Sequence, residues 1–178
     1  MKTGAGQKLH PPVSKRDHIQ GPANAAMTLV EYGDYECPAC GQAYQAIKEV
    51  QRALNGRLRF VFRNFPLSMH PHAEEAAEAA EAAAAQGKFW EMHDALFENQ
   101  EALEDEGLIT YAEQIGLDAR RLATEIEGGA HIGRVREDFD SGVHSGVEGT
   151  PTYFINGLRY DGAYDPESLI AALMDAGE

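Results

Sequence analysis

The sequence predicts an α/β fold in which a strand–helix–strand unit is followed by an all-helical block and then by a strand–strand–helix unit. Two observations support this order. Segments typical of strands occur only near the two ends, at 27–32, 57–67 and 152–156, and strong helix formers fill residues 71–143 between them. At 178 residues the chain is long enough for one domain with an insertion and a sizeable core.

The first unit follows from apolar spacing. Met27–Tyr32 is apolar and β-branched enough for a buried strand. Apolar residues then recur at three- and four-residue steps over 38–54, which predicts a helix that stops at Asn55-Gly56. The alternating aromatic segment 57–67 predicts a second strand. Such a unit places two parallel strands side by side, joined by a right-handed crossover.

The last unit begins after the helical block. Strands are expected at 152–156 and 158–161, with Asn156-Gly157 as the tight turn of a hairpin. A final helix is expected over 166–175, because an aspartate and a proline stand at its start.

Domain boundaries follow from the same order. Residues 1–26 are rich in glycine, proline and charge, and we expect an N-terminal arm that is partly disordered. Segments 27–69 and 147–178 are expected to form the two halves of one domain. Residues 70–146 are the predicted helical insertion between these halves.

The chain is acidic, with 15 Lys and Arg against 29 Asp and Glu and a net charge of −14. Binding of nucleic acid requires a basic face, so we expect no nucleic-acid partner. The longest apolar helix-like stretch, Ala76–Ala85, is too short to span a bilayer, and no apolar run near the N-terminus is typical of a signal peptide. We therefore expect no membrane partner and a cytoplasmic location, or a periplasmic or extracytoplasmic one if a leader has been removed.

Both cysteines, Cys37 and Cys40, lie in "YECPACG" at the junction of the first predicted strand and helix. A disulfide between them would close a tiny loop and add little stability, which favours redox or metal chemistry. The nucleophile of thiol–disulfide exchange is a thiolate, which the unpaired N–H groups and the dipole at a helix start favour. We therefore predict that Cys37 is the nucleophile and that Cys40, one turn later, resolves the mixed disulfide. Pro38 suits the first helical turn, where its missing N–H is not needed.

Two other interpretations of the cysteines stay open. His70 and His72 offer two nitrogens for a zinc site, although H-x-H at this distance is not the usual spacing. The cysteines would otherwise be inert buried thiols. The segment "HPHAEE" is expected to be structural, as a helix cap or a loop hydrogen bond, in preference to a catalytic role.

Four segments resemble the DsbA-like thiol–disulfide oxidoreductases: "LVEYGDYECPACG", "FRNFPLSMHPHAEEAAEAAEAA", "GKFWEMHDALFENQ" and "GVEGTPTYFING". With the lead-in "RDHIQGPANA", the resemblance covers the chain from about residue 16. It implies a thioredoxin-like fold, β-α-β and then β-β-α, with the all-helical insertion between the two halves.

The resemblance also implies three further site residues. Thr150-Pro151 matches the cis-proline that faces the C-x-x-C, where the Thr150 backbone could pair with an extended substrate. Glu31 matches an acidic residue beneath the active site, whose carboxylate could take the proton from Cys40. The alternatives are a trans proline that simply starts a strand and a glutamate on a solvated strand face.

Residues around the cysteines tune the couple. DsbA has a histidine at the position of Ala39, which helps to stabilise its thiolate, and Ala39 cannot do so. Glu36 would disfavour a Cys37 thiolate by like-charge repulsion, or it is an exposed loop acid without a catalytic role. Ala39 and Glu36 therefore predict a less oxidising couple than that of DsbA, and Pro38 is the other residue between the cysteines that is expected to tune the potential.

The sequence thus predicts a thiol–disulfide oxidoreductase that acts on thiol- or disulfide-containing proteins or peptides and is recycled by a redox partner. No metal or organic cofactor is implied beyond the Cys37–Cys40 couple. One alternative is a non-catalytic thioredoxin-fold module that holds a partner or zinc. Another is a glutathione-linked DsbA-like enzyme such as a kappa-type transferase, which typically has serine at the first cysteine.

Overall fold

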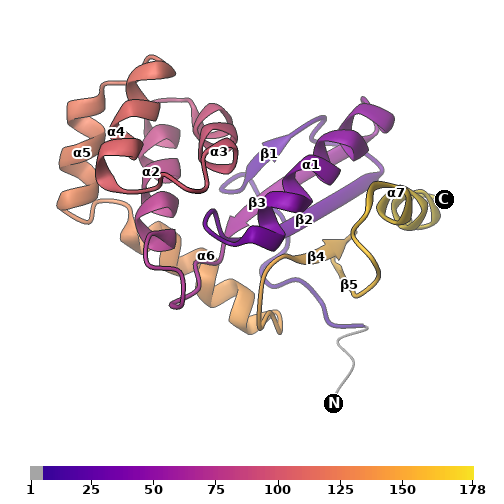
Figure 1. Cartoon of the computed structure of the whole chain (residues 1–178). Coiled ribbons are helices and arrows are strands. Elements are labelled where there is room, and N and C mark those ends of the chain that lie inside the picture. The colour runs from indigo at the N-terminus through magenta and orange to yellow at the C-terminus, as the bar shows by residue number, and fades with distance from the viewer. Residues whose placement is uncertain (1–5) are drawn as a thin grey trace. The chain divides into compact units, whose positions relative to one another are not determined.

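The computed structural model describes residues 6–178, and this part of the chain contains one five-stranded sheet and seven helices (Figure 1). The strands are β1 (His18–Gln20), β2 (Met27–Gly33), β3 (Leu58–Asn64), β4 (Thr152–Ile155) and β5 (Leu158–Tyr160). The helices are α1 (Pro38–Ala53), α2 (Ala73–Ala85), α3 (Phe89–Glu98), α4 (Asp105–Gln114), α5 (Ala119–Glu127), α6 (Ile132–His144) and α7 (Pro166–Ala176). The predicted fold class is confirmed.

The strand order in the sheet is β1-β3-β2-β4-β5, so β2 and β3 are neighbours as predicted. β1 pairs antiparallel with β3, β2 with β4, and β4 with β5. Asn156 and Gly157 have φ angles of 47° and 83°, the left-handed conformation that a tight turn between β4 and β5 requires. Asp165 caps α7 by accepting a hydrogen bond from the Ser168 N–H.

Part of the N-terminal segment 1–26, which was expected to be a partly disordered arm, is built into the sheet. His18, Ile19 and Gln20 pair with β3, and Leu9 is buried. β1 was not predicted, because a strand of three residues is too short to show an alternating pattern. Residues 1–5 lie outside the described residues.

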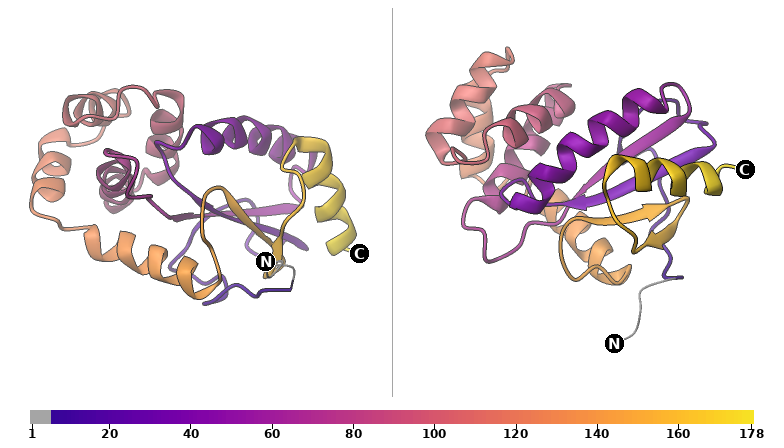
Figure 2. Two further views of the ribbon diagram at one scale, coloured as in Figure 1. Left: turned by 60° about the horizontal axis from the view of Figure 1, so that its bottom comes forward. Right: turned by 45° about the vertical axis from the view of Figure 1, so that its right-hand side comes forward.

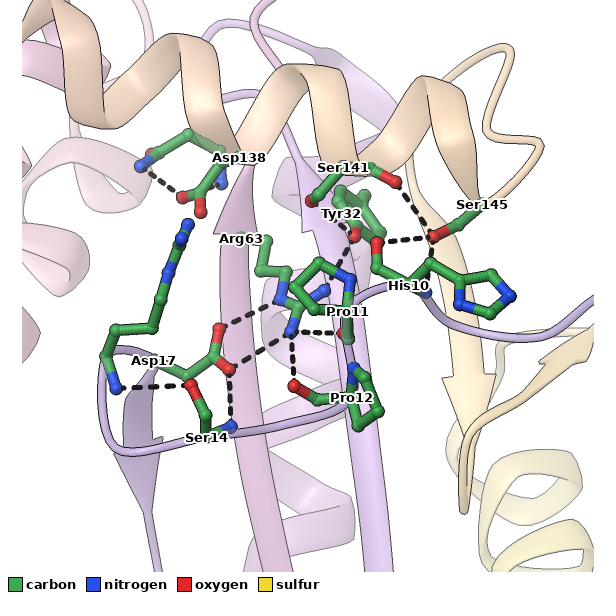
Figure 3. Close-up of polar contacts among 12 residues, drawn as sticks. His10, Pro11, Pro12, Ser14, Asp17, Tyr32, Arg63, Asp138, Ser141 and Ser145 are labelled. Carbon is green, nitrogen blue, oxygen red and sulfur yellow. Dashed lines mark hydrogen bonds and ion pairs between the residues drawn. The ribbon is translucent and has the colours of Figure 1, made fainter.

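A buried ion pair fastens this N-terminal segment to the sheet (Figure 3). Arg63 in β3 donates to both carboxylate oxygens of Asp17, at 2.8 and 3.0 Å, and the two side chains are only 3% and 2% exposed. The same guanidinium donates to the Tyr32 hydroxyl and to the Pro11 carbonyl, each at 2.9 Å. The Tyr32 hydroxyl in turn shares a 2.8 Å hydrogen bond with Ser141 of α6. This polar cluster therefore joins β2, β3, α6 and the N-terminal segment.

The chain divides into two compact units. The first comprises residues up to Gly33, Gln42–Arg63 and Asp140–Glu178, and in it α7 packs on β2 and β4. The second comprises Asp34–Gly41 and Asn64–Phe139, in which α2, α3, α4 and α5 pack together (Figure 2). Within residues 6–178, none of the helices combines the length and the apolar character needed to cross a membrane.

Helix α2 is built entirely from alanine and glutamate, and it buries Glu78, which is 6% exposed. Burial disfavours the carboxylate, and the nearby charges of Glu74 and Glu75 add repulsion, so the pKa of Glu78 is raised to about 7. His131 and Arg136 oppose this shift without cancelling it. Glu78 therefore holds its proton in the folded state over a pH range in which the unfolded chain has released it.

The stability of the protein should accordingly fall as the pH rises from the unfolded pKa of Glu78 towards about 7. Because glutamine cannot lose a proton, Glu78→Gln should be more stable than wild type by about 1–2 kcal/mol near pH 8, after allowance for solvent screening, and equal to it near pH 4. Urea unfolding of both proteins across this range measures the difference, with the exposed Glu113→Gln as control. A difference that does not change with pH would contradict the assignment.

Candidate functional site

The first cysteine stands at the start of α1. Cys37 directly precedes Pro38, the first helical residue, and its carbonyl accepts the N–H of Gly41 at 3.1 Å. Cys37 therefore takes the N-cap position, where the N–H groups of the first turn favour a negative charge. Cys37 and Cys40 are both buried, at 6% and 0% exposed. The predicted place of Cys37 at a helix start is confirmed.

Asp34 organises the loop that leads to Cys37, and it is itself buried, at 1% exposed. Its Oδ1 accepts the N–H groups of Glu36 at 2.7 Å and of Cys37 at 3.2 Å. Its Oδ2 accepts the N–H of Leu67 at 2.8 Å and lies 2.7 Å from Nδ1 of His70. The Asp34 carboxylate thus fixes the backbone at Cys37 and also binds the imidazole of His70.

The imidazole of His70 is biased towards its charged form. Burial alone would lower the pKa of His70, but the hydrogen bond to Asp34 and the negative charges of Asp34, Cys37 and Glu36 together raise it above the ordinary value. The side chain is 18% exposed, so solvent screens these charges only in part. The loop that contains Asp34, Glu36 and Cys37 therefore favours the charged form of His70 over the neutral one.

A second carboxylate–histidine pair lies next to the first. Glu36 accepts the N–H of His72 at 3.0 Å through Oε1, and its Oε2 lies 2.7 Å from Nδ1 of His72. Glu36 is therefore not the exposed loop acid that the sequence analysis weighed, because its side chain is 16% exposed and paired. His72 stands at the N-cap of α2, but its ring makes no capping hydrogen bond there. Of the two structural roles expected for the histidines of "HPHAEE", His72 therefore has the loop hydrogen bond and not the helix cap.

The structure gives no support to the zinc interpretation. Within residues 6–178, no group of three or more histidine, cysteine, aspartate or glutamate side chains is placed to hold a metal ion. Nδ1 of His70 and of His72 is directed at a carboxylate instead.

Hydrogen bonds from the turn that follows α3 hold the same loop. The Nε2 of Gln100 donates to the carbonyls of Tyr35 at 3.0 Å and of Cys37 at 2.8 Å. The Tyr35 hydroxyl shares a 2.9 Å hydrogen bond with Nδ1 of the buried His93. A Cβ at Gly41 would come within 2.1 Å of Oε1 in the Gln100 side chain. A glycine at this position therefore leaves room for the Gln100 side chain. The backbone around Cys37 is therefore held from several sides.

Glu31 belongs to the other compact unit. It lies in β2, directly opposite Tyr153 of β4, and is 2% exposed. The alternative of a glutamate on a solvated strand face is therefore wrong. Its action on Cys40 stays a prediction.

The predicted substrate-binding pair lies in the same unit as Glu31. The Thr150-Pro151 peptide bond is cis and directly precedes β4, which excludes the trans alternative. The next residue, Thr152, pairs with Tyr32 near the end of β2. That Pro151 faces Cys37 stays a prediction. Ala39 is half-buried in the first turn of α1.

Sequence reasoning did not predict Asp34 or Gln100 as site residues, and it treated His70 as structural. An aspartate shortly before a helix start is a local signal for hydrogen bonds to backbone N–H groups. The role of Asp34 could therefore have been predicted from the sequence. No local pattern connects Gln100 or His70 to residues so far away along the chain.

Known proteins provide an independent comparison. Residues 13–175 match the sequence profile of the family described as thioredoxin. A curated relative, the Na(+)/H(+) antiporter NhaA 3 of Salinispora tropica, is 48% identical over 162 residues, which is 90% of this chain and 25% of that protein. The chain thus spans a quarter of the length of that relative.

Two solved structures share the fold. BdbD from Bacillus subtilis superposes with a TM-score of 0.86 at 23% identity, covering 97% of each chain. A thioredoxin-like oxidoreductase from Silicibacter pomeroyi superposes with a TM-score of 0.78 at 25% identity, covering 92% of this chain and 93% of its own. Both matches include the helices between β3 and β4, because they extend over nearly the whole chain.

Proposed function

We propose that this chain, which belongs to the thioredoxin family, exchanges disulfides with thiol- or disulfide-containing proteins or peptides. The exchange takes place through Cys37 and Cys40. A solved protein of the same fold is described as a thioredoxin-like oxidoreductase. The observation that carries the proposal is the place of Cys37 at the N-cap of α1, one turn before Cys40 and in a loop fixed by Asp34.

In the reductive direction the Cys37 thiolate attacks one sulfur of a substrate disulfide. That S–S bond breaks, the attacked sulfur forms a mixed disulfide with Cys37, and the other substrate sulfur leaves as a thiolate. Cys40 loses its proton and attacks the Cys37 sulfur, which releases the second substrate thiolate and leaves a Cys37–Cys40 disulfide. Two electrons have then passed to the substrate, and a cellular thiol reductant regenerates the dithiol. Oxidation of a substrate dithiol is the reverse sequence.

Substrate binding is proposed to involve Thr150 and Pro151. An extended peptide needs an edge of exposed backbone groups with which to pair as an added strand. Thr150 and Pro151 immediately precede β4, whose first residue already pairs with β2. Because they lie before the first paired residue of β4, their backbone groups are the ones that we propose to pair with a bound peptide.

Turnover separates this proposal from a non-catalytic binding module. A peptide carrying a quenched fluorescent disulfide, supplied in large excess with a thiol reductant, should be reduced many times by each protein molecule. Replacing the peptide with oxidised glutathione tests the glutathione-linked alternative. Release of no more than one equivalent of product, with either substrate, would favour the binding module.

Glu31→Gln should slow resolution by Cys40 by about 10- to 100-fold and leave the initial attack by Cys37 unchanged, because the buried Glu31 carboxylate is proposed to accept the Cys40 proton. Rapid mixing followed by acid quench separates the two steps through the amount of mixed disulfide. The exposed Glu49→Gln on α1 is the control. Equal rates for both steps in Glu31→Gln and wild type would remove Glu31 from the mechanism.

The names of the curated relatives favour a second candidate, which departs from the expectation of no membrane partner. Since those relatives are named as Na(+)/H(+) antiporters and are about four times as long as the matched region, we propose a membrane antiporter as one substrate of the exchange. Cys40→Ser expressed in the native host should then trap an antiporter chain as a mixed disulfide in the membrane fraction. Trapping of other proteins alone would exclude this candidate.

A further inference from the structure

Two carboxylates near Cys37, those of Asp34 and Glu36, disfavour a thiolate at this position. The Asp34 carboxylate accepts a hydrogen bond from the backbone of Cys37 itself, at 3.2 Å, and Glu36 is its immediate neighbour. Both groups would raise the energy of a Cys37 thiolate by like-charge repulsion. Without compensation they would cancel the benefit of the helix start.

Compensation comes from the segment that follows β3. We infer that His70 is a positioning residue for the Cys37 thiolate: held by Asp34, it neutralises that carboxylate and supplies the imidazolium that the C-P-A-C sequence lacks at Ala39. This inference rests on the proposed exchange through Cys37. The geometry behind it is the 2.7 Å contact between Nδ1 of His70 and the same carboxylate that binds the Cys37 N–H.

His70 should matter more than His72. The Asp34 side chain is 0% exposed and that of His70 is 18% exposed, whereas Glu36 and His72 are 16% and 37% exposed. Charges with less solvent around them are screened less. Asp34 also accepts a hydrogen bond directly from the Cys37 N–H.

The charged state of His70 agrees with this role. Burial favours the neutral ring, but the hydrogen bond to Asp34 and the charges of Asp34, Cys37 and Glu36 raise the pKa of His70 above its ordinary value. The imidazolium therefore persists to higher pH than in a free histidine and is lost as the pH rises through its raised pKa. Because the thiolate and the imidazolium interact, their titrations are coupled.

This arrangement alters one premise of the sequence-based expectation of a weakly oxidising couple. That expectation assumed that no imidazole stabilises the thiolate. A stabilised thiolate favours the reduced form and makes the couple more oxidising. Loss of the His70 charge should therefore make the couple more reducing, whatever the potential of the wild type.

The test uses the full chain carrying Cys40→Ala, so that Cys37 is the only thiol. The rate of Cys37 alkylation is followed against pH in the parent, in His70→Gln and in His70→Lys. Glutamine keeps a hydrogen-bond donor for Asp34 without charge, and lysine keeps the charge. The matched control is His131→Gln, which removes a histidine bonded to Glu125 at 2.7 Å in a pair that shares no residue with the Cys37 loop.

We expect the midpoint of the alkylation profile to rise by about one pH unit in His70→Gln, which slows the reaction about tenfold below the midpoint. His131→Gln should match the parent, and His70→Lys should restore most of the shift. A parent-like midpoint in His70→Gln would overturn the role of His70 alone. A parent in which Cys37 shows no pH-dependent alkylation would overturn the proposed function as well. Circular dichroism shows whether each variant is folded, and if His70→Gln is not, a midpoint raised in His70→Lys would overturn the charge argument.

Discussion

Cys37→Ser is expected to lose disulfide exchange by about a thousandfold or more, down to the uncatalysed background. A hydroxyl in place of the Cys37 thiol can neither attack a disulfide nor form one. The favourable position at the start of α1 is then of no use, although the loop held by Asp34 stays intact. The measurement is turnover of the fluorescent disulfide peptide, with circular dichroism to show that the variant is folded.

Cys40→Ser is the matched partner of this variant. Since Cys37 remains, the first attack should proceed and stop at the mixed disulfide, which non-reducing gels and mass spectrometry detect. The two serine variants should therefore differ, one inert towards the substrate and the other trapped on it. Turnover of Cys40→Ser at the wild-type rate would show that Cys40 is not the resolving thiol.

The largest loss of stability is expected from Arg63→Gln, at about 3–5 kcal/mol. The guanidinium forms the buried pair with Asp17 and also binds Tyr32 and Pro11 (Figure 3). Its removal leaves the Asp17 carboxylate, 2% exposed, without its main counter-charge. Urea unfolding of the variant and the wild type measures the loss.

Two controls separate the buried pair from a general effect of losing an arginine. Arg121→Gln breaks an exposed pair with Glu125 on one helix and should cost about 0–1 kcal/mol. The double variant Arg63→Met with Asp17→Leu removes both buried charges and should recover much of the loss. If Arg63→Gln costs no more than Arg121→Gln, the cluster does not anchor the N-terminal segment.

The fold was predictable wherever the information is local. The alternating pattern of β3, the helical spacing of α1 and the Asn156-Gly157 turn each lie within a few consecutive residues. β1 was not predicted because its pairing partner, β3, lies far away along the chain. Asp17, which directly precedes β1, is likewise bound by Arg63, 46 residues away. No window of local sequence contains both members of that pair.

The same division holds at the site. Cys37, Pro38 and Cys40 were predicted because a helix start is a local feature of the sequence. The partners of the loop were not, since His70 lies 36 residues from Asp34 and Gln100 lies 63 from Cys37. The negative charge of Glu36 is evident from the sequence, but no local pattern indicates that His72 pairs with it.

The central claim is that Cys37 and Cys40 form one reversible redox couple. Equilibrating the protein with glutathione buffers of graded ratio, trapping with acid and weighing the products by mass spectrometry tests this directly. The account predicts that an intramolecular Cys37–Cys40 disulfide replaces the dithiol in a single two-electron transition. Thiols that stay reduced at every ratio, or that form only mixed disulfides with glutathione, would contradict it.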